Sequence, residues 1–290
     1  MSYVVAGVTG NTGRVVAEAL LSQGKSVRVV VRDAQKGEAW RARGAEVAVA
    51  DLGDRAALTK ALEGAEGAYL LVPPNMAAPS FRAYQDATAD ALVEAVRASR
   101  VPHVVLLSSV GAQHASGTGP IAALHRLEQA LSRLEGTRCS FLRAGYFMEN
   151  LAGSLGMLAE GALPSFYPAD FGIDFVATKD IGKLAAQLLV EGTEAAQIVE
   201  LASPKQSMND AARALAAITG KPVEVKAFPL EAMVPTLTSM GLSGEVAEMY
   251  REMTDGILRG HVAFEGGHRR VLGTSTLEEV LRPIVTGAGA

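Results

Sequence analysis

Gly7-Val8-Thr9-Gly10-Asn11-Thr12-Gly13 leads from an apolar segment at residues 3–7 into a helical pattern at residues 14–23 of this 290-residue sequence. The first glycine permits a tight turn off a strand, the second lets the backbone approach a diphosphate, and the third lets the helix pack close to the sheet. The N-terminus of that helix then presents unpaired N–H groups to phosphate oxygens. In this setting the three glycines predict a dinucleotide-binding turn rather than an ordinary strand–helix connection.

The rest of the first half repeats the alternation of apolar segments and helical patterns. Strands are predicted at residues 26–31, 46–50, 67–72, 104–107 and 139–142. Helices are predicted at residues 54–62, 81–99 and 121–134. Strands joined through helices imply right-handed crossovers and one parallel sheet, so we predict an α/β fold with a Rossmann-type doubly wound parallel sheet. The dinucleotide-binding domain is expected over residues 1–150.

The alternation loosens after about residue 144. We expect residues 151–290 to form a smaller lobe on the substrate side, which closes over the cofactor and returns segments to the main sheet. Its predicted helices are residues 180–190, 208–219 and 274–281 with parts of the Met-rich residues 231–260, and its predicted strands are residues 197–201 and 223–227. Ser207 and Asp210 have the spacing of a helix-capping pair.

The bulk composition narrows the classes of partner. The formal net charge is −4 and no long basic run occurs, so we expect no nucleic-acid partner. No apolar run approaches ~18 residues and no signal-peptide pattern is present, so we expect a cytoplasmic protein without a membrane partner. The histidines show no metal-ligand spacing with carboxylates or cysteine, and we predict no metal site. The single cysteine, Cys139, lies in a predicted strand, which favours a buried structural thiol over a reactive one. A homodimer is left open.

Arg32 indicates which dinucleotide the turn binds. A site that prefers NAD has an acid at the end of the second strand, to accept hydrogen bonds from the ribose. This chain has Arg32 there, and arginine pairs with a 2′-phosphate through charge-assisted hydrogen bonds. Lys36 is close enough in sequence to assist, whereas Asp33 would repel the phosphate if it turned inward. Arg32 as a solvated charge at the strand end is the alternative; we predict NADP(H).

Further cofactor contacts are expected along the same edge of the sheet. Together with Gly7, Gly10, Gly13 and Arg32, the candidate residues are Thr9, Asn11, Thr12, Arg14, Lys36, Asp51, Leu52, Pro73 and Ser108. Asp51 contacts the adenine or caps the turn before the next helix, and we weigh these two alternatives evenly. Ser108 and Ser109 end the fifth predicted strand, where ligands bind in open α/β sheets. They contact the nicotinamide or the substrate, or they cap the next loop.

The glycine spacing, Gly-x-x-Gly-x-x-Gly, resembles that of the atypical short-chain dehydrogenases/reductases and of the NmrA-like family. The similar segments span roughly residues 3–225. Beyond the turn they are Val31-Arg32-Asp33, Asp51-Leu52, Leu142-Arg143-Ala144-Gly145-Tyr146-Phe147-Met148-Glu149-Asn150 and Asp180-Ile181. The resemblance implies either an NADPH-dependent quinone reductase or a regulator that senses the nucleotide.

The residue pair that serves most short-chain dehydrogenases is missing from this chain. Those enzymes use Tyr-x-x-x-Lys in the helix after the fifth strand, where the lysine activates the tyrosine for proton exchange. Here no lysine occurs between Lys60 and Lys179, and no tyrosine occurs between Tyr84 and Tyr146. The mechanism of an ordinary alcohol dehydrogenase or sugar epimerase is therefore not expected.

Two other residues are candidates for a catalytic part. His125 lies about where related sequences carry the helix lysine, and it bonds the ribose or donates a proton, or it is simply a partly exposed helix residue. Tyr146 follows the sixth strand at the ligand edge, together with Asn150, which we interpret as a helix N-cap rather than a substrate contact. Apolar residues available for an acceptor pocket, or for the core, are Pro73, Pro74, Tyr146, Phe147, Met233, Met240, Met249 and Met253.

Two functions follow from these residues. The first is an oxidoreductase that passes a hydride directly from NAD(P)H to a quinone or a similar small-molecule acceptor. Such a reaction needs the reactants stacked in a dry pocket more than it needs a strong acid, because water can protonate the product. The second, suggested by the missing pair, is a non-catalytic protein that senses NADP(H). We favour the enzyme.

Overall fold

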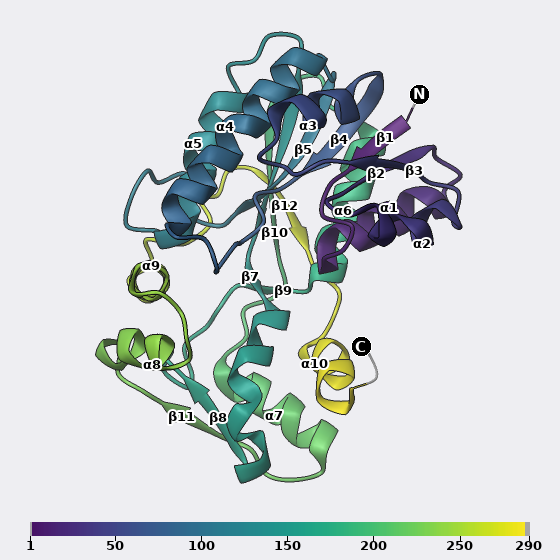
Figure 1. The fold of residues 1–290 in the computed structure, drawn as a ribbon. Helices are drawn as coiled ribbons and strands as arrows, with labels where there is room; N and C mark the ends of the chain where they lie inside the picture. Colours follow the sequence, from purple (N-terminus) through teal and green to yellow (C-terminus); the bar gives the residue numbers. More distant parts are fainter. Residues whose placement is uncertain (1, 288–290) are drawn as a thin grey trace.

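The computed structural model describes residues 2–287, and its centre is a sheet of eight strands (Figure 1). The strands are β1 (Ser2–Val5), β2 (Val27–Val31), β3 (Glu46–Val49), β4 (Ala65–Leu70), β5 (His103–Ser109), β6 (Arg138–Ala144), β10 (Gln197–Ala202) and β12 (Arg269–Leu272). Their order is β12-β10-β6-β5-β4-β1-β2-β3, and every pairing is parallel. The order reverses between β1 and β4, and doubly wound sheets bind their ligands outside the carboxyl ends of the strands at such a reversal. The predicted Rossmann-type fold is confirmed.

Helices cover both faces of this sheet (Figure 1). One face carries α1 (Asn11–Ser22), α2 (Glu38–Arg41) and α6 (Thr178–Glu191), and the other carries α3 (Arg55–Leu62), α4 (Phe81–Ser99) and α5 (Ala122–Leu131). Alternate residues at the first strand supply both layers. Tyr3 and Val5 pack with α1 and α6, whereas Val4 and Ala6 pack with the opposite helices. The inner strands β1, β2 and β5 are covered on both faces and are therefore almost continuously apolar, which makes them recognisable in the sequence.

Polar side chains at the helix starts explain why several boundaries were predictable. Asp54 accepts hydrogen bonds from two backbone N–H groups at the start of α3. Ser80 accepts one such hydrogen bond at the start of α4. The bounds of α4 are those predicted. Ser207 and Asp210 form a reciprocal capping box at α7 (Met208–Thr219). Such caps stabilise a helix end by about 1 kcal/mol each.

A smaller lobe occupies the lower half of Figure 1. Its strands and helices are β7 (Tyr146–Phe147), β8 (Ala162–Ser165), β9 (Phe175–Val176), β11 (Glu224–Ala227), α7, α8 (Met233–Ser239), α9 (Gly244–Leu258), α10 (Leu277–Thr286) and the long 3₁₀ segment η3 (Met148–Glu160). Three short 3₁₀ turns complete the chain: η1 (Ala34–Gly37), η2 (Gly119–Ile121) and η4 (Leu230–Ala232). Leu163, Phe175 and Leu215 lie in an apolar core of the lobe's own. The predicted smaller C-terminal lobe is confirmed.

Residues beyond 150 also build the main layers, since α6, β10 and β12 come from this part of the chain. The division into domains at residue 150 stays a prediction. The sequence did not predict η3, where Gly153 and Gly156 interrupt the helical pattern, or β12, a short edge strand whose side chains are mostly exposed. None of the helices within residues 2–287 combines the length and the apolar character needed to cross a membrane.

Candidate functional site

The glycine turn has the geometry that its sequence predicts. Gly7 has a positive φ of +69°, and the Gly10 N–H donates to the Gly7 carbonyl at 2.9 Å, which closes a tight turn after β1. A Cβ added at Gly13 would lie 2.4 Å from the carbonyl oxygen of Ala6. No side chain fits there, so the third glycine is what allows α1 to start against the end of β1.

The outer side of the turn is open, and this opening fits a dinucleotide phosphate. A Cβ added at Gly10 would meet only the Gly7 carbonyl, at 3.4 Å. Gly10 is the N-cap of α1. Within the described residues no side chain forms a capping hydrogen bond at this helix start, and no acidic residue occupies the first turn. Thr9 and Asn11 beside it are exposed. Free N–H groups at a helix start, with no carboxylate competing for them, attract a phosphate.

The Thr12 side chain has a hydrogen-bond partner on the neighbouring strand β4. Its side chain is 6% exposed, and its hydroxyl accepts a hydrogen bond of 2.9 Å from the hydroxyl of Tyr69 on β4. Burial raises the pKa of Tyr69, so this phenol stays protonated as the donor. Thr12 therefore ties α1 to β4. Its hydroxyl still has its own hydrogen to donate, and the expected side-chain contact with the cofactor stays a prediction.

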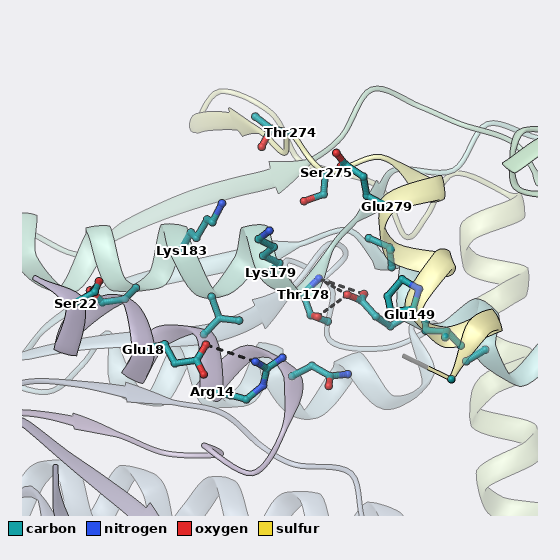
Figure 2. Close-up of a pocket in the computed structure, with 18 of the residues that line it drawn as sticks. Arg14, Glu18, Ser22, Glu149, Thr178, Lys179, Lys183, Thr274, Ser275 and Glu279 are labelled. Atoms are coloured by element: carbon teal, nitrogen blue, oxygen red, sulfur yellow. Dashed lines mark hydrogen bonds and ion pairs between the residues drawn. The ribbon is translucent and has the colours of Figure 1, made fainter. Parts of the chain in front are cut away.

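Arg14 lies on the exposed outer face of α1, in an open groove of about 1570 Å³ between the main sheet's helices and α10. Figure 2 shows Arg14 paired with Glu18 on one wall of this groove, and Lys179 and Lys183 on α6. The Arg14–Glu18 pair has an N–O distance of 3.5 Å and is exposed, so it restrains Arg14 only weakly. Arg14 is therefore able to turn toward a bound phosphate.

Glu149 is a structural link that the sequence reasoning missed. Its carboxylate accepts hydrogen bonds from the N–H and the hydroxyl of Thr178, at 2.9 and 2.5 Å (Figure 2). This contact caps α6 and attaches η3, the first segment of the lobe, to a helix of the main sheet. An acid just after a strand gives no local indication of such a partner 29 residues away.

Arg32 and Lys36 lie exposed just beyond β2, and neither forms an ion pair within residues 2–287. The carboxylate of Asp33, which would repel a phosphate if it turned inward, accepts a hydrogen bond of 2.9 Å from the Gln35 N–H and caps η1. Asp33 is thus engaged by its own turn. Arg32 and Lys36 have no ion-pair partner, and the acid beside them caps its own turn. This arrangement suits the 2′-phosphate of NADP(H) better than it suits a ribose hydroxyl.

Asp51 and Leu52, which follow β3, both have contacts within the fold. The Asp51 carboxylate accepts a hydrogen bond of 2.8 Å from the Gly53 N–H, which is the capping alternative. Leu52 is 9% exposed and packs in the apolar layer with Leu58. Pro73 is half-buried in the segment that follows β4, at the edge beside the strand reversal.

The Ser108 side chain is buried and bonded to a residue of α5. Its side chain is 3% exposed and its hydroxyl donates to the Glu128 carboxylate at 2.5 Å. Glu128 in turn holds Arg143 through two hydrogen bonds. This buried acid on α5 thus holds the Ser108 hydroxyl, and the expected contact of Ser108 with the nicotinamide or the substrate stays a prediction. Ser109 bonds the adjacent Val110 carbonyl at 3.0 Å and remains half-buried at the edge.

The two catalytic candidates lie on different elements, and no hydrogen bond joins them within the described residues. His125 is half-buried on α5, and its Nδ1 lies 2.8 Å from the Ala112 carbonyl, which holds the loop after β5. Tyr146 begins β7. Burial, with a smaller effect from Tyr250, raises the pKa of Tyr146 to about 12, and the Asn150 side chain offsets this only partly. A general acid works best with a pKa near the working pH, so Tyr146 suits hydrogen-bond donation better than proton transfer.

A second cavity, the lobe cavity, lies among η3, β8, α8 and α9 and has a volume of about 650 Å³. Tyr146, which follows β6, and Met76, which follows β4, both line it, so it adjoins the carboxyl edge of the sheet. Of the apolar candidates, Met233, Met240 and Met253 line this cavity as well. Met249 instead packs with Phe81, and Phe147 packs against the main core. Pockets of this size and apolar character are typical of small-molecule sites.

Neither a reactive thiol nor a metal-binding cluster is found among the described residues. Cys139 is 1% exposed in β6, and burial raises its pKa to about 12, so the thiol is unreactive. Residues 2–287 contain no group of three or more His, Cys, Asp or Glu side chains placed to hold a metal ion.

Comparisons with known proteins agree with this site. The model of the NmrA-like family matches residues 2–260. The chain is 28% identical over 253 residues to the NAD(P)H azoreductase of Xenophilus azovorans, covering 86% of this chain and 85% of that protein. It is 26% identical over 263 residues to quinone oxidoreductase 2 of Escherichia coli, covering 88% of each chain. The crystal structure of this NADPH-dependent quinone oxidoreductase from Escherichia coli matches with a TM-score of 0.78, 25% identity and 99% coverage of both chains.

Proposed function

The chain belongs to the NmrA-like family, and on this basis we propose that it is an NADPH-dependent oxidoreductase that reduces a quinone or a similar conjugated small molecule. Two relatives that match most of its length bear the names of such enzymes, an NAD(P)H azoreductase and a quinone oxidoreductase. The alternative of a non-catalytic NADP(H) sensor has less support, because these relatives are named as reductases.

One observation carries the proposal: a cavity with an apolar lining adjoins the edge of the sheet where the phosphate turn lies. Gly10 leaves the turn open to a diphosphate, and Arg32 and Lys36 stand unpaired beyond β2 for a 2′-phosphate. The cavity reaches the same edge through Met76 and Tyr146. A cofactor bound along this edge would have its reactive ring next to a space for an acceptor.

NADPH, when bound, supplies a hydride, which carries two electrons and one hydrogen nucleus. The overall reaction is quinone plus NADPH plus one proton to hydroquinone plus NADP⁺. The apolar cavity excludes water from the acceptor and positions its ring, and Tyr146 donates a hydrogen bond to an acceptor oxygen. Solvent supplies the proton, since no residue that lines the cavity is an acid, a histidine or a lysine.

The decisive experiment follows NADPH oxidation by its near-ultraviolet absorbance while a panel of quinones and azo compounds is added. We expect turnover, and faster turnover with NADPH than with NADH. The sensor alternative is tested in parallel by calorimetry with NADP⁺ and NADPH. If no acceptor is reduced and the two cofactor forms bind with clearly different affinities, the enzyme is disproved and the sensor is favoured.

The homodimer and the cytoplasmic location stay predictions. The small-molecule acceptor is the partner that the lobe cavity and the names of the relatives support.

A further inference from the structure

The lobe cavity contains no charged group in its wall. None of its lining residues is Asp, Glu, Lys, Arg or His, and methionine and aromatic residues make up about half of the lining. Its polar groups are neutral hydroxyls and one amide, such as those of Tyr146, Asn150 and Thr254. A charged ligand that entered would lose its hydration without gaining an ion pair, which strongly disfavours it. A neutral ligand would lose little and would bury apolar surface.

The rim of this cavity is apolar as well. Only a few large apolar side chains are exposed within residues 2–287, and three of them line this cavity. They are Met76 at 40%, Phe228 at 42% and Met240 at 61% exposed. Met76 comes from the segment after β4, Phe228 follows β11, and Met240 ends α8. Apolar side chains that converge from separate segments on one opening indicate that an apolar molecule passes or covers it.

Building on the proposed function, we propose that the lobe cavity selects uncharged aromatic acceptors and rejects acceptors that carry an anionic group. The specificity resides in the neutral wall, and Met76 and Met240 at the rim are specificity-determining positions. Methionine side chains are flexible and polarizable, so they adapt to flat rings of different outline. The cavity therefore discriminates by charge more than by shape.

The test compares two quinones that share one ring system, 2-methyl-1,4-naphthoquinone and 1,4-naphthoquinone-2-sulfonate. Binding is measured by calorimetry on the full chain saturated with NADP⁺, so that no reduction occurs, and turnover is measured separately with NADPH. We expect the neutral quinone to bind at least about tenfold more tightly. The preference should persist in about 1 M salt, where the Debye length is about 3 Å and the net negative charge of the protein is screened.

Two variants locate the discrimination in the cavity. In Met76→Lys the new ammonium group should pair with the sulfonate, so the ratio of the affinities for the neutral and the anionic quinone should fall at least about threefold. The neutral control Met76→Gln should leave this ratio nearly unchanged. Met240→Lys, at a more exposed position on another element, tests the same point if the first variant unfolds. Thermal unfolding checks that each protein is folded.

The outcomes separate this inference from the proposed function. Equal affinity for both quinones, or a preference that salt abolishes, overturns the charge selection while leaving quinone reduction intact. A preference that neither lysine variant changes overturns the assignment to this cavity. No binding and no turnover of either quinone contradicts the proposed function, and the charge selection fails with it.

Discussion

The guanidinium of Arg143 and the carboxylate of Glu128 form a buried two-pronged ion pair. Nε lies 3.1 Å from Oε1 and Nη2 lies 2.8 Å from Oε2, and the two side chains are 5% and 4% exposed. Arg143 stands near the end of β6, two strands from the reversal, and Glu128 stands on α5. The pair thereby locks the helix that follows β5 to the strand that leads into Tyr146 and the lobe.

Removing the carboxylate of this pair should destabilise the whole domain. Glu128→Ala leaves a buried guanidinium whose remaining ion-pair partner, Glu265, is exposed, which should lower the free energy of unfolding by about 3–5 kcal/mol. Urea denaturation measures the loss. The control is Glu94→Ala, which breaks the exposed pair with Arg97 on α4 and should cost less than about 1 kcal/mol. An equal loss of unfolding free energy in both variants would show that the buried pair contributes no more to stability than the exposed pair.

Two alanine substitutions in the glycine turn should separate binding from folding. Gly10→Ala meets only one atom, at 3.4 Å, so stability should change by less than about 1 kcal/mol while NADPH affinity falls, because the methyl group occupies the path of the phosphate. Gly13→Ala collides with the Ala6 backbone and should lose both properties.

Thermal unfolding and calorimetric NADPH titration of both turn variants provide the measurement. Gly244→Ala, at an open position of α9, is the control and should behave like the parent protein. Full NADPH affinity in Gly10→Ala would place the diphosphate elsewhere.

Arg32→Asp tests the choice of cofactor. The change removes the cation expected at the 2′-phosphate and adds an anion, so NADPH binding should weaken by about 2 kcal/mol or more, roughly 30-fold. NADH binding should change little or improve, because an acid there accepts hydrogen bonds from the ribose. Calorimetric titration of both cofactors gives the two ratios. If NADPH affinity is unchanged, Arg32 faces solvent and the preference has another source.

His103 should make stability depend on pH. Burial lowers its pKa below 6.5 in the folded protein, and the nearby Arg138 lowers it further, whereas a backbone hydrogen bond at Leu189 opposes the shift. As the pH falls below about 6.5, the imidazole of His103 becomes protonated in the unfolded chain but stays neutral in the folded chain. The free energy of unfolding therefore decreases, by at most about 1.4 kcal/mol per pH unit.

The measurement for His103 is the free energy of urea unfolding between about pH 7 and pH 5, compared with His103→Gln. The variant should show a shallower decline over this window. Identical pH dependence in both proteins would assign the effect to other groups.

Local features account for most of what was predicted correctly. The apolar strands, the helix caps at Asp54 and Ser207 and the glycine turn all depend on neighbours within a few residues, so their sequence patterns are sufficient. The sequence does not reveal side-chain partners that lie far away in the chain. The Thr12 hydroxyl accepts a hydrogen bond from Tyr69, 57 residues away, and the Ser108 hydroxyl donates one to Glu128, 20 residues away. No local pattern reveals such partners.

The amino-acid sequence alone was enough to specify a Rossmann-type sheet, a phosphate turn and a cation at the end of β2, because periodicity and glycine chemistry act over short distances. The tertiary structure settled which side chains stay available to a ligand. Thr12, Ser108 and Asp33 form hydrogen bonds within the protein, while Met76, Tyr146, Met233, Met240 and Met253 are brought together around one uncharged cavity. Hydrogen bonds and apolar contacts form between whichever groups the fold makes adjacent, and that adjacency exists only after the chain has folded.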